Sequence, residues 1–166
     1  MLTKIISGGQ NGVDKAALRA AKAFGLQTGG TMPKGFKTLS GPKPNFATLY
    51  NMTEDKSSSY PPRTESNVKN SDGTLMIAVD FNSAGEKCTQ RFIDKHNKPQ
   101  FDINPLEFYY IKSIVGWIDY WNIKVLNVAG NSEKTAPGIG KETEEFLGRL
   151  FLQLGYKSNG ISRTYR

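Results

Sequence analysis

The stretch IISGGQNGVDKAAL, residues 5–18, indicates the fold class of this chain. It begins with apolar, β-branched residues, continues through glycines and ends in alanines. This order is typical of a short strand that turns through a glycine loop into a helix. In parallel sheets such turns present backbone N–H groups to anions. The stretch therefore predicts a strand–loop–helix unit whose loop binds a phosphate.

The loop matches neither of the two common phosphate-binding patterns. In the dinucleotide pattern G-x-G-x-x-G, Ser7 replaces the first glycine, and the QTGG of the next expected strand lacks the acid that holds a ribose. In the pattern G-x-x-x-x-G-K-[ST], Glu142 follows the chain's Gly-Lys pair. NAD binding and nucleoside triphosphate hydrolysis are therefore disfavoured. If Gly9 admits a phosphate, Gly9→Ala should weaken binding; if the glycines only shape a tight turn, it should lower stability alone.

Strand-like and helical patterns alternate along most of the chain. Apolar residues in the first and last expected helices recur at the i, i+3, i+4 spacing of a helix packed on a sheet. This alternation predicts a single α/β domain over residues 1–166, a Rossmann-like three-layer fold with a mainly parallel sheet of five or more strands. Strands are expected at 3–7, 26–29, 74–79, 99–102 and 124–128, and helices at 13–24, 87–96, 106–121 and 140–154.

Two segments depart from this alternation. Residues 31–69 hold five prolines and little periodicity, and long irregular loops in compact domains are usually functional or disordered. We expect this segment to be an irregular loop that lies over the site. Residues 156–166 are expected to form a basic tail.

Composition sets limits on environment and partners. The 166 residues carry a net charge of +7 and a single cysteine, Cys88, which excludes an internal disulfide. Neither a signal-like segment nor an apolar run of membrane-spanning length is present, so a cytoplasmic protein without membrane contact is expected. No cluster of residues has metal-ligand spacing. The apolar stripe over 106–121 is wide for one helix and predicts a homo-oligomer.

Three loops are expected at the carboxyl ends of strands, where parallel sheets bind ligands. They are SGGQNGVD, SAGEKCT and NVAGNSEK. Arg63, between the first two, suits contact with a phosphate or carboxylate, and equally a surface ion pair with Glu65 or Asp72. The side chains and glycines predicted to contact an anionic, phosphorylated small molecule are Gly9, Gln10, Gly12, Asp14, Arg63, Asn67, Ser71, Asp72, Thr74, Gly85, Thr89, Gly130, Asn131 and Ser132.

The strings IISGGQNGVDKAAL, RTESNVKNSDGTL, LNVAG and PGI occur in an order and spacing that resemble the molybdenum cofactor carrier proteins. These are related to the phosphoribohydrolases and DNA-processing protein A. The resemblance implies a protein that binds molybdenum cofactor (molybdopterin) without chemical turnover, and it adds Gly8 and Thr64 to the contacts above. The chain departs from the family after LNVAG, where Asn131 to Lys134 replace Pro-Arg-Glu-Ser and an arginine is missing.

Two other functions stay open. A nucleotide-binding or nucleotide-hydrolysing protein, resembling the phosphoribohydrolases, would use acids near a helix start, although the Pro-Gly-Gly-x-Gly-Thr-x-x-Glu loop of those enzymes is absent. Single-stranded nucleic acid is a less favoured partner, suggested by the basic charge and by loop tyrosines that could stack on bases. The acids are Glu142, Glu144 and Glu145, and the tyrosines are Tyr50, Tyr60, Tyr156 and Tyr165.

Overall fold

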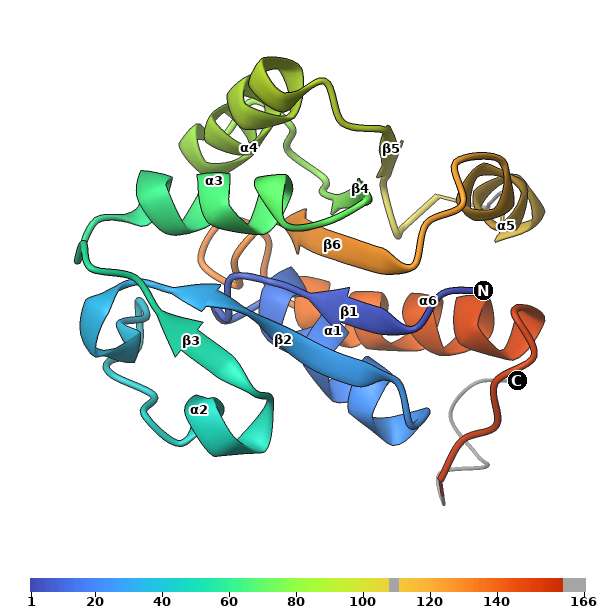
Figure 1. Ribbon diagram of the computed structural model, residues 1–166, viewed down its shortest axis with the longest axis horizontal. Helices are drawn as coiled ribbons and strands as arrows, with labels where there is room; N and C mark the ends of the chain where they lie inside the picture. Colours follow the sequence, from blue (N-terminus) through green and yellow to red (C-terminus); the bar gives the residue numbers. More distant parts are fainter. Residues whose placement is uncertain (108–110, 160–166) are drawn as a thin grey trace.

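The computed structural model describes residues 1–107 and 111–159 (Figure 1). Within them, six strands form one parallel sheet in the order β3-β2-β1-β6-β4-β5, which confirms the predicted Rossmann-like α/β fold. The strands are β1 (Lys4–Ile6), β2 (Gln27–Met32), β3 (Met52–Glu54), β4 (Gly73–Ile77), β5 (Gln100–Ile103) and β6 (Val125–Gly130). The helices are α1 (Val13–Ala23), α2 (Phe46–Leu49), α3 (Tyr60–Lys69), α4 (Ala84–His96), α5 (Ile111–Tyr120) and α6 (Ile139–Gln153), with a 3-10 turn, η1 (Lys34–Phe36).

Helices cover both faces of the sheet (Figure 1). On one face α1, α5 and α6 share the largest cluster of buried apolar side chains with the strands, and Phe24, just after α1, packs edge-on against Phe151 of α6. On the other face, Val68 of α3 and Phe92 of α4 pack with Met76 of β4. The core therefore has two layers, separated by the sheet.

The strand order positions a crevice between β6 and β4. These strands are neighbours, with Leu75 beside Val128, but the helices that follow them lie in the layers on opposite faces. Loops that diverge in this way leave a gap beyond the carboxyl ends of the strands, where open α/β sheets bind ligands. The loop after β1 lies at the same edge, because β1 pairs in parallel with β6.

Residues 31–69 differ from the irregular loop that was expected. The segment contains the end of β2, strand β3 and helix α3. Pro61 and Pro62 lie in the first turn of α3, where a missing N–H costs nothing, so these prolines begin a helix rather than prevent one. Met52 and Phe46 complete a smaller apolar cluster on Met32.

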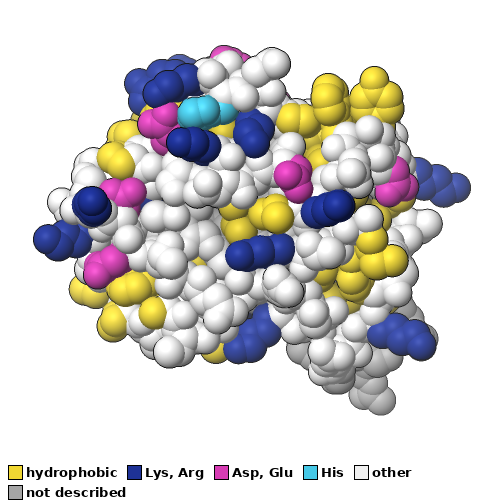
Figure 2. Space-filling view, viewed as in Figure 1, with side chains coloured by type: hydrophobic (Ala, Val, Ile, Leu, Met, Phe, Trp, Pro, Cys, Tyr) yellow, Lys and Arg dark blue, Asp and Glu magenta, His cyan; other side chains and the backbone are white. Residues whose placement is uncertain are grey.

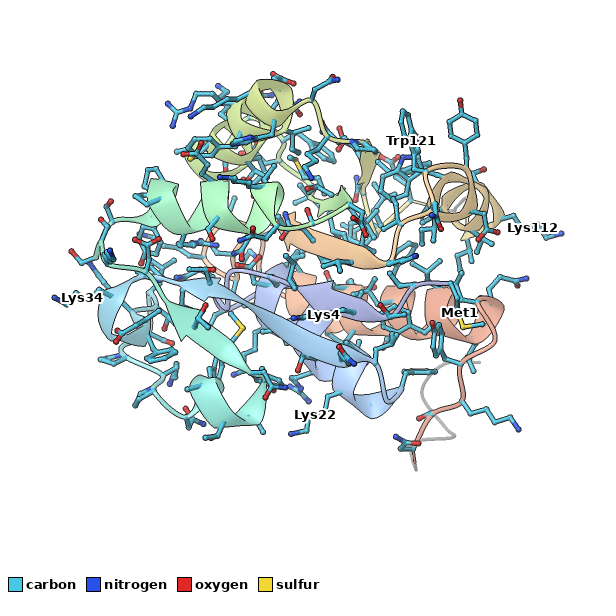
Figure 3. All side chains as sticks on the ribbon, viewed as in Figure 1. Met1, Lys4, Lys22, Lys34, Lys112 and Trp121 are labelled. Atoms are coloured by element: carbon cyan, nitrogen blue, oxygen red, sulfur yellow. The ribbon has the colours of Figure 1, made fainter. Side chains whose placement is uncertain are left out.

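The helix expected at 106–121 is shorter in the structure. Leu106 and Glu107 lie in a turn, and α5 begins at Ile111. The Tyr110 position and residues 160–166, most of the predicted basic tail, lie outside the described residues. Exposed Trp121 follows the end of α5 (Figure 3). Over the described ranges, none of the helices combines the length and apolarity needed to cross a bilayer.

Basic side chains do not gather into one patch on the face shown in Figure 2, where lysines and arginines are interspersed with acids. Lys22, Lys34 and Lys112 project from three different sides of the molecule (Figure 3). Hydrophobic side chains gather near α5 (Figure 2). The charge therefore gives no single track that would follow a nucleic-acid backbone on this face.

Candidate ligand-binding site

A cavity of about 410 Å³ lies at the carboxyl edge of the sheet. The loops after β1, β4 and β6 and the first turns of α3 enclose it, as the divergence of α4 and α6 requires. The structure thus brings all three predicted loops to one site. Its wall consists of Gly8, Gln10, Asp14, Leu39, Tyr60, Pro61, Arg63, Thr64, Asn67, Ser83, Ala84, Gly85, Glu86, Cys88, Thr89, Asn127, Ala129, Gly130, Ser132 and Thr135.

Arg63 provides the positive charge of this cavity. Among the described residues it is the only lysine, arginine or histidine in the wall. Its guanidinium lies over the ring of Tyr60, 5.6 Å from the centroid, and directly above Gly8, where any Cβ would overlap Nη1. The Nε atom is buried, and no acceptor in the described part of the chain reaches it. Arg63 therefore has one buried donor that the described residues leave unpaired.

Asp14 is the nearest carboxylate to Arg63. Its Oδ2 lies 3.5 Å from Arg63 Nη1 and accepts a hydrogen bond of 3.2 Å from the Gln10 amide. Burial raises the pKa of Asp14 above its ordinary value, Arg63 and the Gln10 amide oppose this, and the charge of Glu86 adds to it. A buried acid with one long ion pair neutralises Arg63 only partly.

The start of α4 opens into the cavity. Ser83 is the N-cap, and the amide of Lys87 is the first to donate into the helix, to the Ser83 carbonyl. The N–H groups before Lys87 consequently have no acceptor within the helix. A Cβ at Gly85 would meet only the Ser83 hydroxyl, at 3.9 Å, so the space above this turn is open. Together with Arg63, this turn can hold an anion.

The start of α6 is closed by a side chain of the protein itself. Glu133 accepts hydrogen bonds from the Gly138 amide at 2.7 Å and from the Gly140 amide at 2.8 Å. The carboxylate therefore occupies the place that an anion would take at this helix end.

In the glycine loop after β1, Gly9 and Gly12 pack against other parts of the protein. Gly9, with φ 73°, faces Met32, whose Sδ would lie 2.8 Å from an added Cβ. Gly12 packs on the backbone of Asn131, which accepts a hydrogen bond of 3.2 Å from the Val13 amide. Neither glycine lines the cavity. Their missing side chains make room for neighbouring parts of the protein.

Many of the predicted contacts line the cavity. Among them, the side chains of Gln10 and Asn67 form hydrogen bonds within the protein. Gln10 donates to the Lys37 carbonyl and accepts from the Leu39 amide. Asn67 accepts from the Thr31 amide and donates to the Thr31 carbonyl. The lining residues are Gly8, Gln10, Asp14, Arg63, Thr64, Asn67, Gly85, Thr89, Gly130 and Ser132.

The other predicted contacts do not line the cavity. Ser71 and Asp72 precede β4, at the opposite edge of the sheet, where Asp72 accepts from the amides of Lys124 and Val125. The side chains of two more are used inside the protein. Thr74 accepts a hydrogen bond from Asn127, and Asn131 holds the loop after β4 through the amides of Val79 and Asp80. The residues that do not line the cavity are Gly9, Gly12, Ser71, Asp72, Thr74 and Asn131.

The predicted contacts of the small-molecule site did not include Ser83 and Glu86, and Tyr60 was named only as a residue that could stack on nucleic-acid bases. The spacing Ser83-x-x-Glu86 is that of a capping box, which marks a helix start and could have drawn attention to this turn. Nothing in the local sequence indicates that Glu86 is buried, since its burial depends on how α4 packs against α3 and β6.

The acids and tyrosines of the two alternative functions lie mostly elsewhere. Glu144 pairs with Arg19 at 3.4 Å and Glu145 with Lys141 at 3.9 Å, and neither they nor Glu142 line the cavity. Tyr50 is buried, and the Tyr156 hydroxyl donates to the Leu2 carbonyl. Tyr60 alone of the described tyrosines lines the cavity, and the position of Tyr165 lies outside the described residues.

Cys88 and His96 do not form a metal centre. Cys88 is half-buried at the cavity wall, and His96 contacts the Glu65 carboxylate at 2.9 Å. Over residues 1–107 and 111–159, no three side chains of the types that bind metals lie close enough together to hold an ion.

The fold and the cavity define a Rossmann-like α/β protein with a cavity at the carboxyl edge of its sheet, the place where open α/β sheets bind small molecules. The chain belongs to the circularly permutated YpsA SLOG family, whose model matches residues 5–151. It is similar to a crystal structure from Syntrophus aciditrophicus SB named "Putative molybdenum carrier protein", with 36% identity and a TM-score of 0.82 over 91% of this chain and 95% of that one. No curated protein matches the chain.

Proposed function

We propose that this protein binds and carries a phosphorylated small molecule, the molybdenum cofactor in the form of molybdopterin, without transforming it. The observation that carries the proposal is the buried Nε of Arg63, which has no acceptor among the described residues. A volume of about 410 Å³ is within the usual range of small-molecule sites. The name of the Syntrophus structure, "Putative molybdenum carrier protein", supports a carrier role.

In this proposal the phosphate lies between Arg63 and the first turn of α4. Backbone N–H groups and a guanidinium are the donors that bind phosphate with the best geometry. The starts of α1 and α6 are less suitable, because Val13 already donates to Asn131 and Glu133 fills the start of α6. Molybdenum would arrive inside the pterin rather than on protein ligands.

Native mass spectrometry of protein purified without stripping tests the proposal directly. The expected result is an additional mass on the wild-type protein, and a fluorescent pterin after that sample is oxidised. Arg63→Ala should lose both. Wild-type protein that carries no pterin, and does not take one up from a molybdopterin-containing extract, would contradict the proposal.

Nucleotide hydrolysis is the second candidate, favoured by the carboxylates of Asp14 and Glu86 in the cavity wall. Such carboxylates could activate water next to a ribosyl bond. Incubation with nucleoside monophosphates distinguishes the two functions: a carrier releases no base, whereas a hydrolase releases base at a rate that falls in Asp14→Asn or Glu86→Gln.

A further inference from the structure

Glu86 is a buried carboxylate with few partners. The residue is 4% exposed and lines the cavity. One of its oxygens accepts a hydrogen bond from the Ser83 hydroxyl, and no lysine, arginine or histidine in the described part of the chain forms an ion pair with it. Asp14, in contrast, has both Arg63 and a backbone amide.

The helix position does not explain this burial. An acid in the first turn of a helix interacts favourably with the helix dipole, and it does so at the surface. Glu142 occupies the first turn of α6 and is half-buried outside the cavity, so the same preference is met there without enclosure. Burying a carboxylate costs free energy unless donors surround it. Among the described residues the Glu86 carboxylate accepts a hydrogen bond from Ser83 alone, so a ligand in the cavity can supply further donors to it.

Arg63 and Glu86 present opposite requirements to the same cavity. Arg63 has a buried donor without an acceptor, and the Glu86 carboxylate can accept more hydrogen bonds than the one from Ser83. A plain phosphate provides an acceptor for Arg63 and no N–H group for Glu86. A ligand that satisfies both must carry an anionic or carbonyl acceptor and a separate group of N–H donors.

We infer that Glu86 binds the N–H edge of a 2-amino-4-oxopyrimidine ring, the ring found in pterins and in guanine. Its ring N–H and 2-amino group are adjacent donors that one carboxylate can accept together. The inference rests on the proposed function and deepens it, because it names the side chain that selects the heterocycle. Arg63 and the α4 amides then hold the acceptor end of the ligand.

Two matched ligand pairs test this, each differing at the 2-amino group. Guanosine and inosine monophosphate are titrated into the wild-type protein by calorimetry, and pterin and lumazine by fluorescence. The expected preference for the amino compound is tenfold or more in the pair that binds, because a lost hydrogen bond leaves a buried charge unpaired. Absence of a preference in both pairs overturns the inference and needs no variant protein.

Glu86→Gln identifies the residue responsible. The variant should bind inosine monophosphate or lumazine within about threefold of the wild type and lose the preference for the amino compound. Glu142→Gln is the matched control, because it removes a first-turn acid away from the cavity and should keep the preference. A preference that survives in Glu86→Gln overturns the inference.

These outcomes are separable from a failure of the proposed function. Inorganic phosphate that competes with both members of a pair, without a preference for the amino compound, overturns only the role of Glu86. Protein that carries no pterin and binds none of the probes overturns the proposed carrier function as well.

Discussion

The starts of α4 and α6 lie at the same edge of one sheet, yet only α4 opens into the cavity. Both helices follow a strand and a glycine-containing loop, so their local sequences predict the same capacity to bind an anion. At α6 the Glu133 carboxylate accepts from Gly138 and Gly140. At α4 the corresponding space is open above Gly85. A helix start is therefore a ligand site only where no side chain of the protein has filled it.

The same contrast bears on the sequence that follows β6. The resemblance to the carrier proteins implies an arginine at the position of Ser132, which lines the cavity, and a glutamate at the position of Glu133, which closes the start of α6. Among the described wall residues, Arg63 is the one basic side chain beside the carboxylates of Asp14 and Glu86.

The variant Gly85→Asp would place a carboxylate at the start of α4, as Glu133 does at the start of α6. We expect this variant to have the largest effect on phosphate binding. Placing a carboxylate in the open space should weaken binding of inorganic phosphate by about 100-fold, roughly 2.7 kcal/mol, by repulsion and by competition for the amides. Folding stability should not fall, because an acid in the first turn is favourable. Calorimetry measures the binding and thermal unfolding the stability.

Gly85→Asn is the matched control, with the same size and no charge, and should bind far better than Gly85→Asp. Equal binding by Gly85→Asp and the wild type would show that the phosphate does not lie at α4.

A pair of glycine variants separates the cavity wall from the packed interior. Gly8→Ala places a methyl group against Arg63, so the guanidinium must move and phosphate affinity should fall about tenfold, 1.4 kcal/mol. Gly9→Ala meets Met32 at a positive φ and should lower stability by roughly 1 kcal/mol while leaving affinity unchanged. Affinity and melting temperature are measured on the same preparations. The opposite assignment, with binding lost in Gly9→Ala alone, would restore Gly9 as the phosphate contact.

Glu133→Ala would open the start of α6. Removing the acceptor of two backbone amides should lower the free energy of unfolding by about 1 kcal/mol, as for the loss of a helix cap. Added phosphate should then raise the melting temperature of the variant more than that of the wild type, since an anion can replace the carboxylate. Lys134→Ala, an exposed neighbour, is the control. An unchanged melting temperature would mean that Glu133 does not stabilise α6.

Asp14→Asn should have the smallest effect, seen in the pH dependence of stability. Burial raises the native pKa of Asp14 above its ordinary value of 3.8, so the native state holds this proton more tightly than the unfolded chain. That stabilisation is complete below the unfolded pKa and is lost as the pH rises through the native pKa. The stability of the wild type relative to Asp14→Asn should therefore be greatest in acid and decline with rising pH in chemical denaturation. A difference that grows with pH would show that Arg63 outweighs burial.

The architecture of this protein could be predicted from its amino-acid sequence. The apolar stripes of 13–24 and 140–154 and the short runs between helices predicted a parallel sheet, since strand and helix periods depend on local side-chain order. The glycine loops and Arg63 pointed to the carboxyl edge of the sheet, because ligands of parallel sheets bind there. The prolines at 61 and 62 favoured the prediction of an irregular loop over residues 31–69, although proline in the first turn begins a helix as readily as it interrupts one elsewhere.

Which of those groups line the cavity depends on the tertiary structure. Gly8 and Gly9 are adjacent and identical, yet one lies under Arg63 and the other against Met32. Asp72 lies at the far edge of the sheet, and Glu86, which local sequence assigns to a helix cap, is buried in the cavity. Burial and partners depend on contacts between residues far apart in the chain, which no local pattern specifies. Whether a helix start is open or filled is therefore a property of the folded protein.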